Sequence, residues 1–362
     1  MNRRSVFRIS RLGRASVCCC GALVLLFSAA RFAEASGTST AGVSPSNLSS
    51  KVAASIRSVS REKTASIVRI RCLDEHGEVN GTGFYIDPTG TICTLLEIVR
   101  GGRSISVLQD GKEYPATLRA MDPRSGVAFL KVNEVSGSVA SATPQGTRSF
   151  IPPSVLTNAP VLTPLLGIGV PREDYPAVSL GMITGSVTHE GDFYFCVPHL
   201  LAEITLREGE GGSPILDLSG NLVGMVVHGT SKAGEFRILP SGAIEKLQRD
   251  FLRFGKFNPG WVGAVVEEAA VPQGASRTRI AAVEPASPAE NSGLRAGDMI
   301  LSIAGRNIIN PDEVLAASFY LSAGEQVGVT ILRSGEVRKL QLLCSVPPGF
   351  SWGLGSALPT GD

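Results

Sequence analysis

Short apolar runs separated by Gly, Pro, Asp and Asn fill the sequence between residues 81 and 229. The runs cover residues 83–86, 91–96, 127–132, 178–183 and 222–227. Just before them, apolar residues alternate with Arg69 and Arg71 over residues 68–72, which is the period-two pattern of a half-buried strand. Many short strands at this spacing are typical of an all-β barrel or sandwich. We therefore expect a mainly β unit over residues 61–255.

A helix is predicted to close this unit. Apolar residues recur at helical spacing over 242–254, at Ile244, Leu247, Phe251 and Leu252. The turn sequence Asn258-Pro-Gly then marks a domain boundary.

A second, smaller unit is predicted over residues 258–345. Strands are expected at 279–283, 299–303, 326–332 and 338–343, and one amphipathic helix is expected over 311–321. This mixture predicts a small α+β module. Residues 346–362 are rich in Pro and Gly and are expected to form a flexible tail.

The first 35 residues have the layout of a secretory signal peptide. Five arginines precede residue 15, an apolar run follows to about residue 30, and Ala33-Glu-Ala35 offers a small-x-small cleavage site. The alternative is an uncleaved membrane anchor, but the run is shorter than the roughly 20 residues that a spanning helix needs. We expect cleavage, a linker or loose helix over 36–60, and a periplasmic or secreted protein with no membrane attachment afterwards.

The net positive charge of the chain comes from this leader. The whole sequence has 34 Lys and Arg against 32 Asp and Glu, whereas residues 36–362 have 28 against 31. The exported part therefore has a formal charge of −3 and no basic stripe, which argues against nucleic acid as a partner.

Four cysteines lie outside the leader. Cys72, Cys93, Cys196 and Cys344 show no C-x-x-C spacing, so a thiolate metal site is not expected. An exported protein is permitted disulfides, but we favour small buried hydrophobic residues on strands. The sequence indicates no metal and no cofactor.

Several runs in the second unit resemble bacterial PDZ domains. They are Glu284-Pro-Ala-Ser-Pro-Ala289, Gly293-Leu-Arg-Ala-Gly-Asp298 and Met299-Ile-Leu-Ser-Ile303, followed by Gly305. Gly260-Trp-Val-Gly263 resembles the loop that captures a peptide's terminal carboxylate in this family. The resemblance implies that C-terminal peptides of envelope or secreted proteins add as a strand beside the one that starts at Trp261.

The same resemblance assigns candidate peptide-binding residues. The loop and strand supply Trp261, Val262, Gly263, Ala264 and Val265, and the facing helix supplies Val314, Ala317 and Leu321. For any single helix residue the alternative is a purely structural place in the core, which apolar residues commonly take.

The first unit resembles the protease domain of the HtrA family, the secreted trypsin-like proteases that carry PDZ domains. Residues 81–94 resemble the strand pair before the family's histidine, and residues 122–131 resemble the segment that holds its aspartate. Gly209-Glu-Gly-Gly-Ser-Pro-Ile-Leu-Asp217 resembles the nucleophile loop. The resemblance implies a trypsin-like double β-barrel followed by a PDZ domain.

The motifs around the catalytic triad resemble those of the family, but the three triad residues themselves differ. Counting along each motif, Glu97 takes the histidine position, Gly126 the aspartate position and Gly211 the nucleophile position. The mechanism needs a hydroxyl nucleophile, an imidazole that accepts its proton, and a carboxylate that orients the imidazole. These three positions are therefore expected to be non-catalytic.

Two other arrangements of side chains are open to this sequence. Ser213, two positions after Gly211, and His228, on a strand resembling the cleft wall of trypsin-like enzymes, would form the dyad of a rearranged protease. Glu97, Glu203 and His228 are residue types that bind metals, but no ligand spacing supports a metal cluster.

The sequence thus favours a non-catalytic protease homologue that binds peptides and acts as a scaffold or regulator of envelope proteins. One alternative is an active endopeptidase that uses Ser213 and His228. Another is a structural protein that forms homo-oligomers or docks onto active HtrA relatives.

Overall fold

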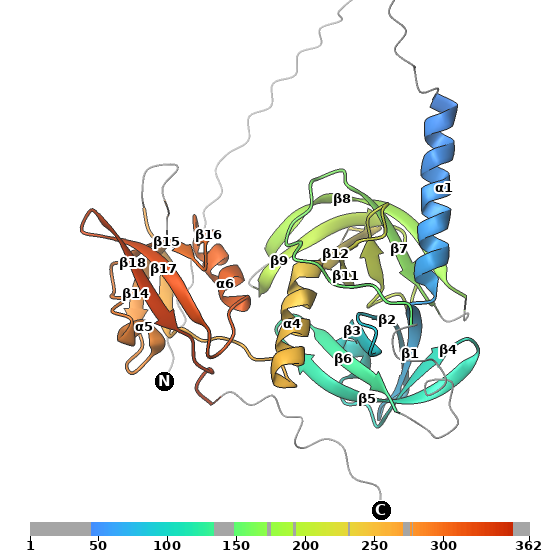
Figure 1. Cartoon of the computed structure of the whole chain (residues 1–362), viewed down its shortest axis with the longest axis horizontal. Coiled ribbons are helices and arrows are strands. Elements are labelled where there is room, and N and C mark those ends of the chain that lie inside the picture. Colours follow the sequence, from blue (N-terminus) through green and yellow to red (C-terminus); the bar gives the residue numbers. More distant parts are fainter. Residues whose placement is uncertain are drawn as a thin grey trace, which may run out of the picture. The chain divides into compact units, whose positions relative to one another are not determined.

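The structure is a computed structural model, and it describes residues 45–133, 148–171, 175–190, 193–230, 232–270, 276 and 278–349. The predicted leader over 1–35 and the tail from residue 350 onward lie outside these residues. Most of the described chain forms two closed six-stranded barrels followed by a separate sheet (Figure 1). The mainly β fold, a double barrel with a small α+β domain after it, is confirmed.

The first barrel closes in the order β1-β2-β3-β6-β5-β4. Its interior is apolar, and Ile70, Phe84, Ile92 and Phe129 are fully buried in it. The half-buried alternation predicted over residues 68–72 is not found there, because Arg69 is buried as well and only Arg71 is partly exposed. Its strands are β1 (Ile67–Leu73), β2 (Glu78–Tyr85), β3 (Thr91–Leu95), β4 (Ser104–Gln109), β5 (Lys112–Asp122) and β6 (Val127–Val132). The short helix α2 (Leu96–Val99) follows β3.

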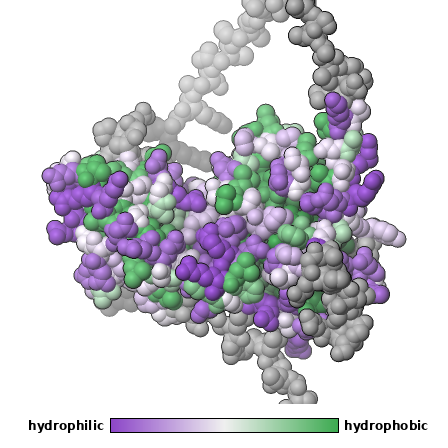
Figure 2. Space-filling model, viewed as in Figure 1, coloured by the Kyte–Doolittle hydropathy of each residue, from purple (hydrophilic) through white to green (hydrophobic). Residues whose placement is uncertain are grey.

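The second barrel closes in the order β10-β11-β12-β9-β8-β7. Its strands are β7 (Pro164–Gly169), β8 (Ala177–Glu190), β9 (Phe193–Ile204), β10 (Pro214–Leu216), β11 (Leu222–Gly229) and β12 (Glu235–Pro240). On β8, Val178, Leu180 and Met182 are 43%, 57% and 44% exposed at alternate positions, so they form one outward row. In the view of Figure 2, which is that of Figure 1, apolar side chains gather on the surface of the molecule where β8 and β9 lie.

Two helices pack on the barrels. Helix α4 (Ser241–Phe254) ends on Gly255, whose left-handed backbone caps it, and it matches the closing helix predicted over 242–254. Helix α1 (Pro45–Thr64) covers much of the segment predicted as a linker or loose helix. It is held by Val59, which is buried in the barrel core, and by the Ser55 hydroxyl, which donates to the carbonyl of Leu218 over 2.8 Å.

The third unit is one sheet in the order β13-β14-β15-β17-β18, with β16 paired to β15. Its hydrophobic core includes Ile280, Ile331 and Leu342. Its elements are β13 (Ala264–Glu268), β14 (Thr278–Val283), α5 (Pro288–Asn291), β15 (Met299–Ile303), β16 (Arg306–Asn307), α6 (Pro311–Phe319), β17 (Gln326–Arg333) and β18 (Glu336–Leu343).

A buried polar cluster joins α4 to the turn after α6. Lys246 and Asp250 lie one helical turn apart with Nζ and Oδ2 2.5 Å from each other, and both side chains are almost fully buried. Asp250 also accepts hydrogen bonds from the Ser322 hydroxyl over 2.7 Å and from the Asn258 amide over 3.0 Å. A buried carboxylate with several donors is tolerated because each lost water contact is replaced.

The four cysteines are free thiols in the structure, and Cys72, Cys93 and Cys344 are buried. Burial raises the pKa of Cys196 to about 12, so this thiol is neutral at physiological pH. No helix in the described part of the chain is both long and apolar enough to cross a membrane.

Candidate functional site

The three positions that the sequence motifs assign to a trypsin-like triad come together between the barrels. Glu97 lies on α2, directly after β3. The amide of its neighbour Leu96 donates to the carbonyl of Gly126 over 2.7 Å, which brings the first and second positions together. A Cβ placed on Gly211 would lie 3.3 Å from Cδ1 of Leu95, so the third position borders the same turn.

The backbone at the second position favours glycine. Gly126 has a φ of +71°, in the left-handed region that most side chains avoid. An aspartate is tolerated there better than most residues, but at a cost of about 1 kcal/mol. Glycine at this position has no carboxylate, and the backbone conformation also disfavours an aspartate there.

His228 on β11 lies beside Glu97. Its Nε2 is 3.2 Å from Oε1 of Glu97, and the two side chains are 45% and 62% exposed. Glu97 is thus not a buried carboxylate, and its partner is an imidazole from the second barrel. The two residues have the types of a catalytic pair, but the hydroxyl that such a pair would activate is missing at Gly211.

Ser213 does not join this pair. Its side chain is fully buried, and its Oγ has no hydrogen-bond partner among the residues that the structure describes. Nearby Glu210 is also buried: its Oε2 accepts from the Arg207 amide over 2.7 Å, while its Oε1 has no partner there. Burial raises the pKa of Glu210. The arrangement holds Ser213 in the wall of the barrel and leaves its hydroxyl without a base.

Thr82 fixes the loop that would carry the nucleophile. Its amide donates to the carbonyl of Gly211 over 2.9 Å, and its hydroxyl donates to the carbonyl of Gly209 over 3.1 Å. The same hydroxyl accepts the Val170 amide over 3.1 Å. Gly212 is required beside it, because a Cβ at that position would lie 2.3 Å from the carbonyl oxygen of Thr82.

His199 is a buried histidine that the sequence gives no reason to single out. It lies on β9 with 4% exposure, and its Nδ1 has no partner within the described chain. Burial lowers its pKa to about 4, and the nearby His228 contributes to the same shift. It is therefore a neutral residue at physiological pH, and its ring packs against Phe195 with centroids 4.5 Å apart.

Of the three residues suited to a metal, Glu97 and His228 contact each other, whereas Glu203 has a different partner. Glu203 pairs with Lys232 over 2.5 Å, away from the contact between Glu97 and His228. Within the described residues, no group of three or more His, Cys, Asp or Glu side chains is placed to hold a metal ion.

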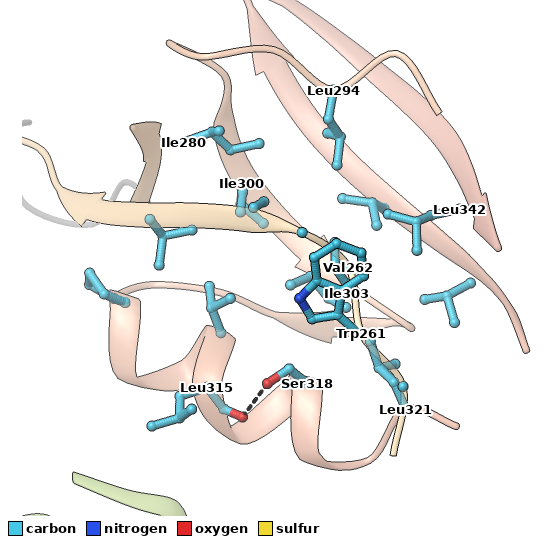
Figure 3. Close-up of a pocket in the computed structure, with 18 residues that line it drawn as sticks. Trp261, Val262, Ile280, Leu294, Ile300, Ile303, Leu315, Ser318, Leu321 and Leu342 are labelled. Atoms are coloured by element: carbon cyan, nitrogen blue, oxygen red, sulfur yellow. Dashed lines mark hydrogen bonds between the residues drawn. The ribbon is translucent and has the colours of Figure 1, made fainter. Parts of the chain in front are cut away.

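The third unit has an apolar cavity of about 270 Å³ between β13 and α6 (Figure 3). Six of the predicted binding residues line it: Trp261, Val262, Gly263, Ala264, Val314 and Leu321. Val265 and Ala317 do not. Val265 is 50% exposed on the other face of β13, and Ala317 is buried in the core. In their place, Val266 on the strand and Leu315 and Ser318 on the helix line the cavity.

Two features of this cavity suit an extended chain with a terminal carboxylate. Strand β13 is an outer strand of its sheet, so one edge is open to a further strand. The amides of Val262 and Gly263 donate to no acceptor among the described residues, whereas the Trp261 amide is bonded to Ser345 over 2.7 Å. Gly263 has a φ of +78° and lies against Ser287, where a Cβ would lie 2.3 Å from that residue's own Cβ.

Comparison with known proteins agrees with this architecture. Residues 81–225 match the model of the trypsin-like peptidase domain, and residues 279–333 match that of the PDZ domain. Curated relatives named probable periplasmic serine endoprotease DegP-like are 27% identical over 285 residues in Marinomonas sp. and 28% over 281 residues in Ectopseudomonas mendocina. Each alignment covers 74% of this chain, which spans only 57% and 56% of the relatives' length.

Solved structures show the same fold. The HtrA-type protease AlgW with a tripeptide superimposes with a TM-score of 0.64 at 20% identity, over 81% of this chain and 97% of that one. The serine endoprotease from Yersinia pestis gives a TM-score of 0.57 at 19% identity, over 80% and 97%. A trypsin-like double barrel joined to a PDZ domain is the class of protein that this fold defines. Within that class, the two domain matches and the DegP-like relatives support the HtrA family for this chain.

Proposed function

We propose that this chain is an exported HtrA-type protein that binds peptides without hydrolysing them, as a scaffold or regulator in protein quality control. One observation carries the proposal. The turn that brings the three triad-equivalent positions together offers Glu97, Gly126 and Gly211 in place of an imidazole, a carboxylate and a hydroxyl. A protease without its triad retains only about a thousandfold acceleration over water.

The buried state of Ser213 supports the same conclusion. A nucleophilic serine needs its hydroxyl within hydrogen-bond reach of a base, and the imidazole of His228 instead contacts Glu97. The rearranged dyad would require the Ser213 side chain to leave the wall of the barrel and His228 to change its partner. The endopeptidase remains the alternative that the first experiment tests.

A serine-reactive fluorophosphonate probe distinguishes the two functions. We expect no labelling of the purified protein, with an active DegP-like relative labelled in parallel as the positive control. Casein and fluorogenic peptides are expected to remain uncleaved. Labelling or turnover that disappears in Ser213→Ala would overturn the proposal.

The PDZ domain is the proposed binding site. Its cavity is apolar, the β13 edge is open, and the free amides of Val262 and Gly263 are suited to a carboxylate. HtrA-type AlgW has been solved with a bound tripeptide and with a decapeptide, which supports peptide binding here. The ligands are expected to be apolar C-terminal segments with dissociation constants from low micromolar to sub-millimolar, about 4 to 8 kcal/mol.

Fluorescence anisotropy with labelled peptides tests this site. Amidation of the terminal carboxylate is expected to weaken binding at least tenfold. Val314→Asp, which places a charge in the cavity, should have a similar effect, while Val337→Asp, on the exposed face of β18, serves as the matched control. Indifference to both amidation and Val314→Asp would exclude this groove as the site.

Export is proposed from the leader-like sequence of residues 1–35 and from relatives whose names place them in the periplasm. Intact-mass measurement of the protein recovered from a periplasmic extract is expected to give an N-terminus at Ser36. Recovery of the uncleaved chain in the membrane fraction would contradict the proposal.

The outward row on β8 favours one further role, association with a second copy or with an active HtrA relative. Val178, Leu180 and Met182 are exposed on adjacent positions of one strand face, as in a surface that a partner covers. Light scattering after size exclusion is expected to show an oligomer, or a complex with an added relative, that Leu180→Glu disrupts. A monomer that binds no relative would exclude this role.

A further inference from the structure

A further cavity, apart from the two sites described above, lies on the first barrel. It has a volume of about 430 Å³, compared with 270 Å³ for the PDZ cavity. Its walls are the segment after α2, over residues 99–105, and β5 with the turn after it, over 115–123. It includes none of the positions 97, 126, 211 or 228, and its size falls in the range of small-molecule sites.

Local backbone geometry creates this hollow. Gly101 has a φ of +73°, and a Cβ there would meet nothing within 4 Å, while a Cβ on Gly102 would lie 2.1 Å from Sγ of Cys72. Two consecutive residues without side chains therefore form one wall. The Arg103 amide donates to the carbonyl of Leu73 over 2.7 Å, which fixes the segment to the end of β1.

The interior of the cavity is apolar. Val99 and Ala116 are buried side chains at its base, and Ile105, Leu118 and Met121 are half-buried around them. Ile105 and Ala116 are paired across β4 and β5, so the base lies where the two strands begin to separate. An apolar body is favoured there by the area that it removes from water.

The rim carries two positively charged side chains. Arg100 and Arg103 line the cavity, are exposed, and form no ion pair with any described carboxylate, and no acidic residue lines the cavity. Arg71, close by on β1, does have a carboxylate partner, Glu113. Guanidinium groups bind carboxylate and phosphate through two parallel hydrogen bonds.

We propose that this cavity binds a small anionic amphiphile, a molecule with an apolar chain and a carboxylate or phosphate head. The chain lies on Val99, Ala116 and Leu118, and Arg100 and Arg103 hold the head. The proposal is independent of the proposed peptide-binding function, because it uses a different unit of the chain.

Titration calorimetry with decanoate tests the site in the purified protein. The carboxylate and hydrophobic chain of decanoate also suit the PDZ groove, so the titration is performed in the Val314→Asp background. We expect decanoate to bind there with one site per chain. Decanol, which has the same chain and no charge, is expected to bind at least tenfold more weakly. Decyl phosphate in place of decanoate shows which head group is preferred.

Variants locate the binding. The double variant Arg100→Gln with Arg103→Gln is expected to weaken decanoate at least tenfold, and Ser104→Trp, which places a bulky ring at the rim, should do the same. Arg119→Gln removes one exposed charge from β5 outside the lining and is the matched control that should bind normally.

Four results would overturn the proposal. These are no binding of either anionic amphiphile, unchanged binding in the double arginine variant, equal binding of decanol, and tight binding of an acidic apolar peptide where decanoate does not bind. Circular dichroism of each variant distinguishes a lost site from a lost fold, and if Ser104→Trp fails to fold, the double arginine variant still decides the outcome.

Discussion

Thr82 of the first barrel and Gly211 of the nucleophile loop are joined by a backbone hydrogen bond of 2.9 Å across the boundary between the barrels. Because the Thr82 hydroxyl also bonds to Gly209 and Val170, one side chain holds the loop and the second barrel together. The framework around Glu97, Gly126 and Gly211 is thus maintained by hydrogen bonds that involve none of these three side chains.

Replacing Thr82 with Val should expose the importance of this hydroxyl. The change keeps the shape and removes one hydrogen-bond partner from the buried Val170 amide and one from the partly buried Gly209 carbonyl. We expect a loss of about 2 to 3 kcal/mol in the free energy of unfolding. Urea denaturation measures it, with Thr82→Ser as the variant that keeps the hydroxyl and Thr117→Val, a half-buried strand position, as the control. A loss below about 0.5 kcal/mol would contradict the assignment.

His199 should make stability depend on pH. Its pKa is lowered to about 4 in the folded state, mainly by burial, from an ordinary value of 6.5. Between these values the unfolded chain takes up a proton that the folded chain does not, so stability is lost as pH falls from 6.5 towards 4. We expect about 2 kcal/mol of this loss between pH 7 and 4.5 to be absent in His199→Leu. The exposed His76 provides the control variant, His76→Gln, and an unchanged pH profile in His199→Leu would refute the assignment.

The contact between Glu97 and His228 should contribute little to stability. Both side chains are about half exposed, and ion pairs in contact with water typically contribute 0 to about 1 kcal/mol. Glu97→Gln, His228→Gln and the double variant form a thermodynamic cycle that measures the pair directly. A coupling above about 2 kcal/mol would indicate a structural role that the exposure does not suggest.

The ion pair between Asp298 and Arg333 in the PDZ domain should contribute more to stability than the contact between Glu97 and His228. Asp298 is 1% exposed, and the Arg333 Nε and Nη2 donate to its two carboxylate oxygens over 2.6 and 2.7 Å. Burial alone would raise the pKa of Asp298, but the bonds from Arg333 and from the Arg295 amide outweigh it and the pKa is lowered.

Asp298→Asn is therefore expected to cost about 3 kcal/mol, because it leaves a partly buried guanidinium without its charge partner. The pKa of Asp298 lies below its ordinary value of 3.8, so the pair stabilises the folded state at higher pH. This stabilisation is lost when acid protonates Asp298 below pH 3.8. Thermal unfolding of the variant against Glu336→Gln, which breaks an exposed pair with Arg338, measures the difference. Equal effects of the two substitutions would contradict it.

Strong local patterns made much of the fold predictable. The strand over 299–303 is found at Met299–Ile303, and the helix predicted over 242–254 is α4, because Pro, Gly and apolar periodicity fix these elements locally. Helix α1 was not distinguished from a linker. Its sequence has six serines, which are weak helix formers, and the contact of Val59 with the barrel is a tertiary one that no local pattern reveals.

The groove residues were harder to assign than the groove itself. Ala264, Val265 and Val266 are all apolar, so no polar residue indicates which of them faces the cavity. Helix α6 presents the same problem, since Val314 and Ala317 are both apolar and only the former lines the cavity. His199 is identified only by burial, which depends on the closure of the second barrel.

The open edge of β13 has a thermodynamic consequence. A peptide can add as a strand beside β13 only when the domain is folded, because the edge of the sheet exists only then. Peptide binding and folding are therefore linked equilibria. At a hundredfold excess over the dissociation constant such a guest adds about 2.7 kcal/mol to the folded state. The melting temperature of this domain would then report how much of it is occupied, without any label on the guest.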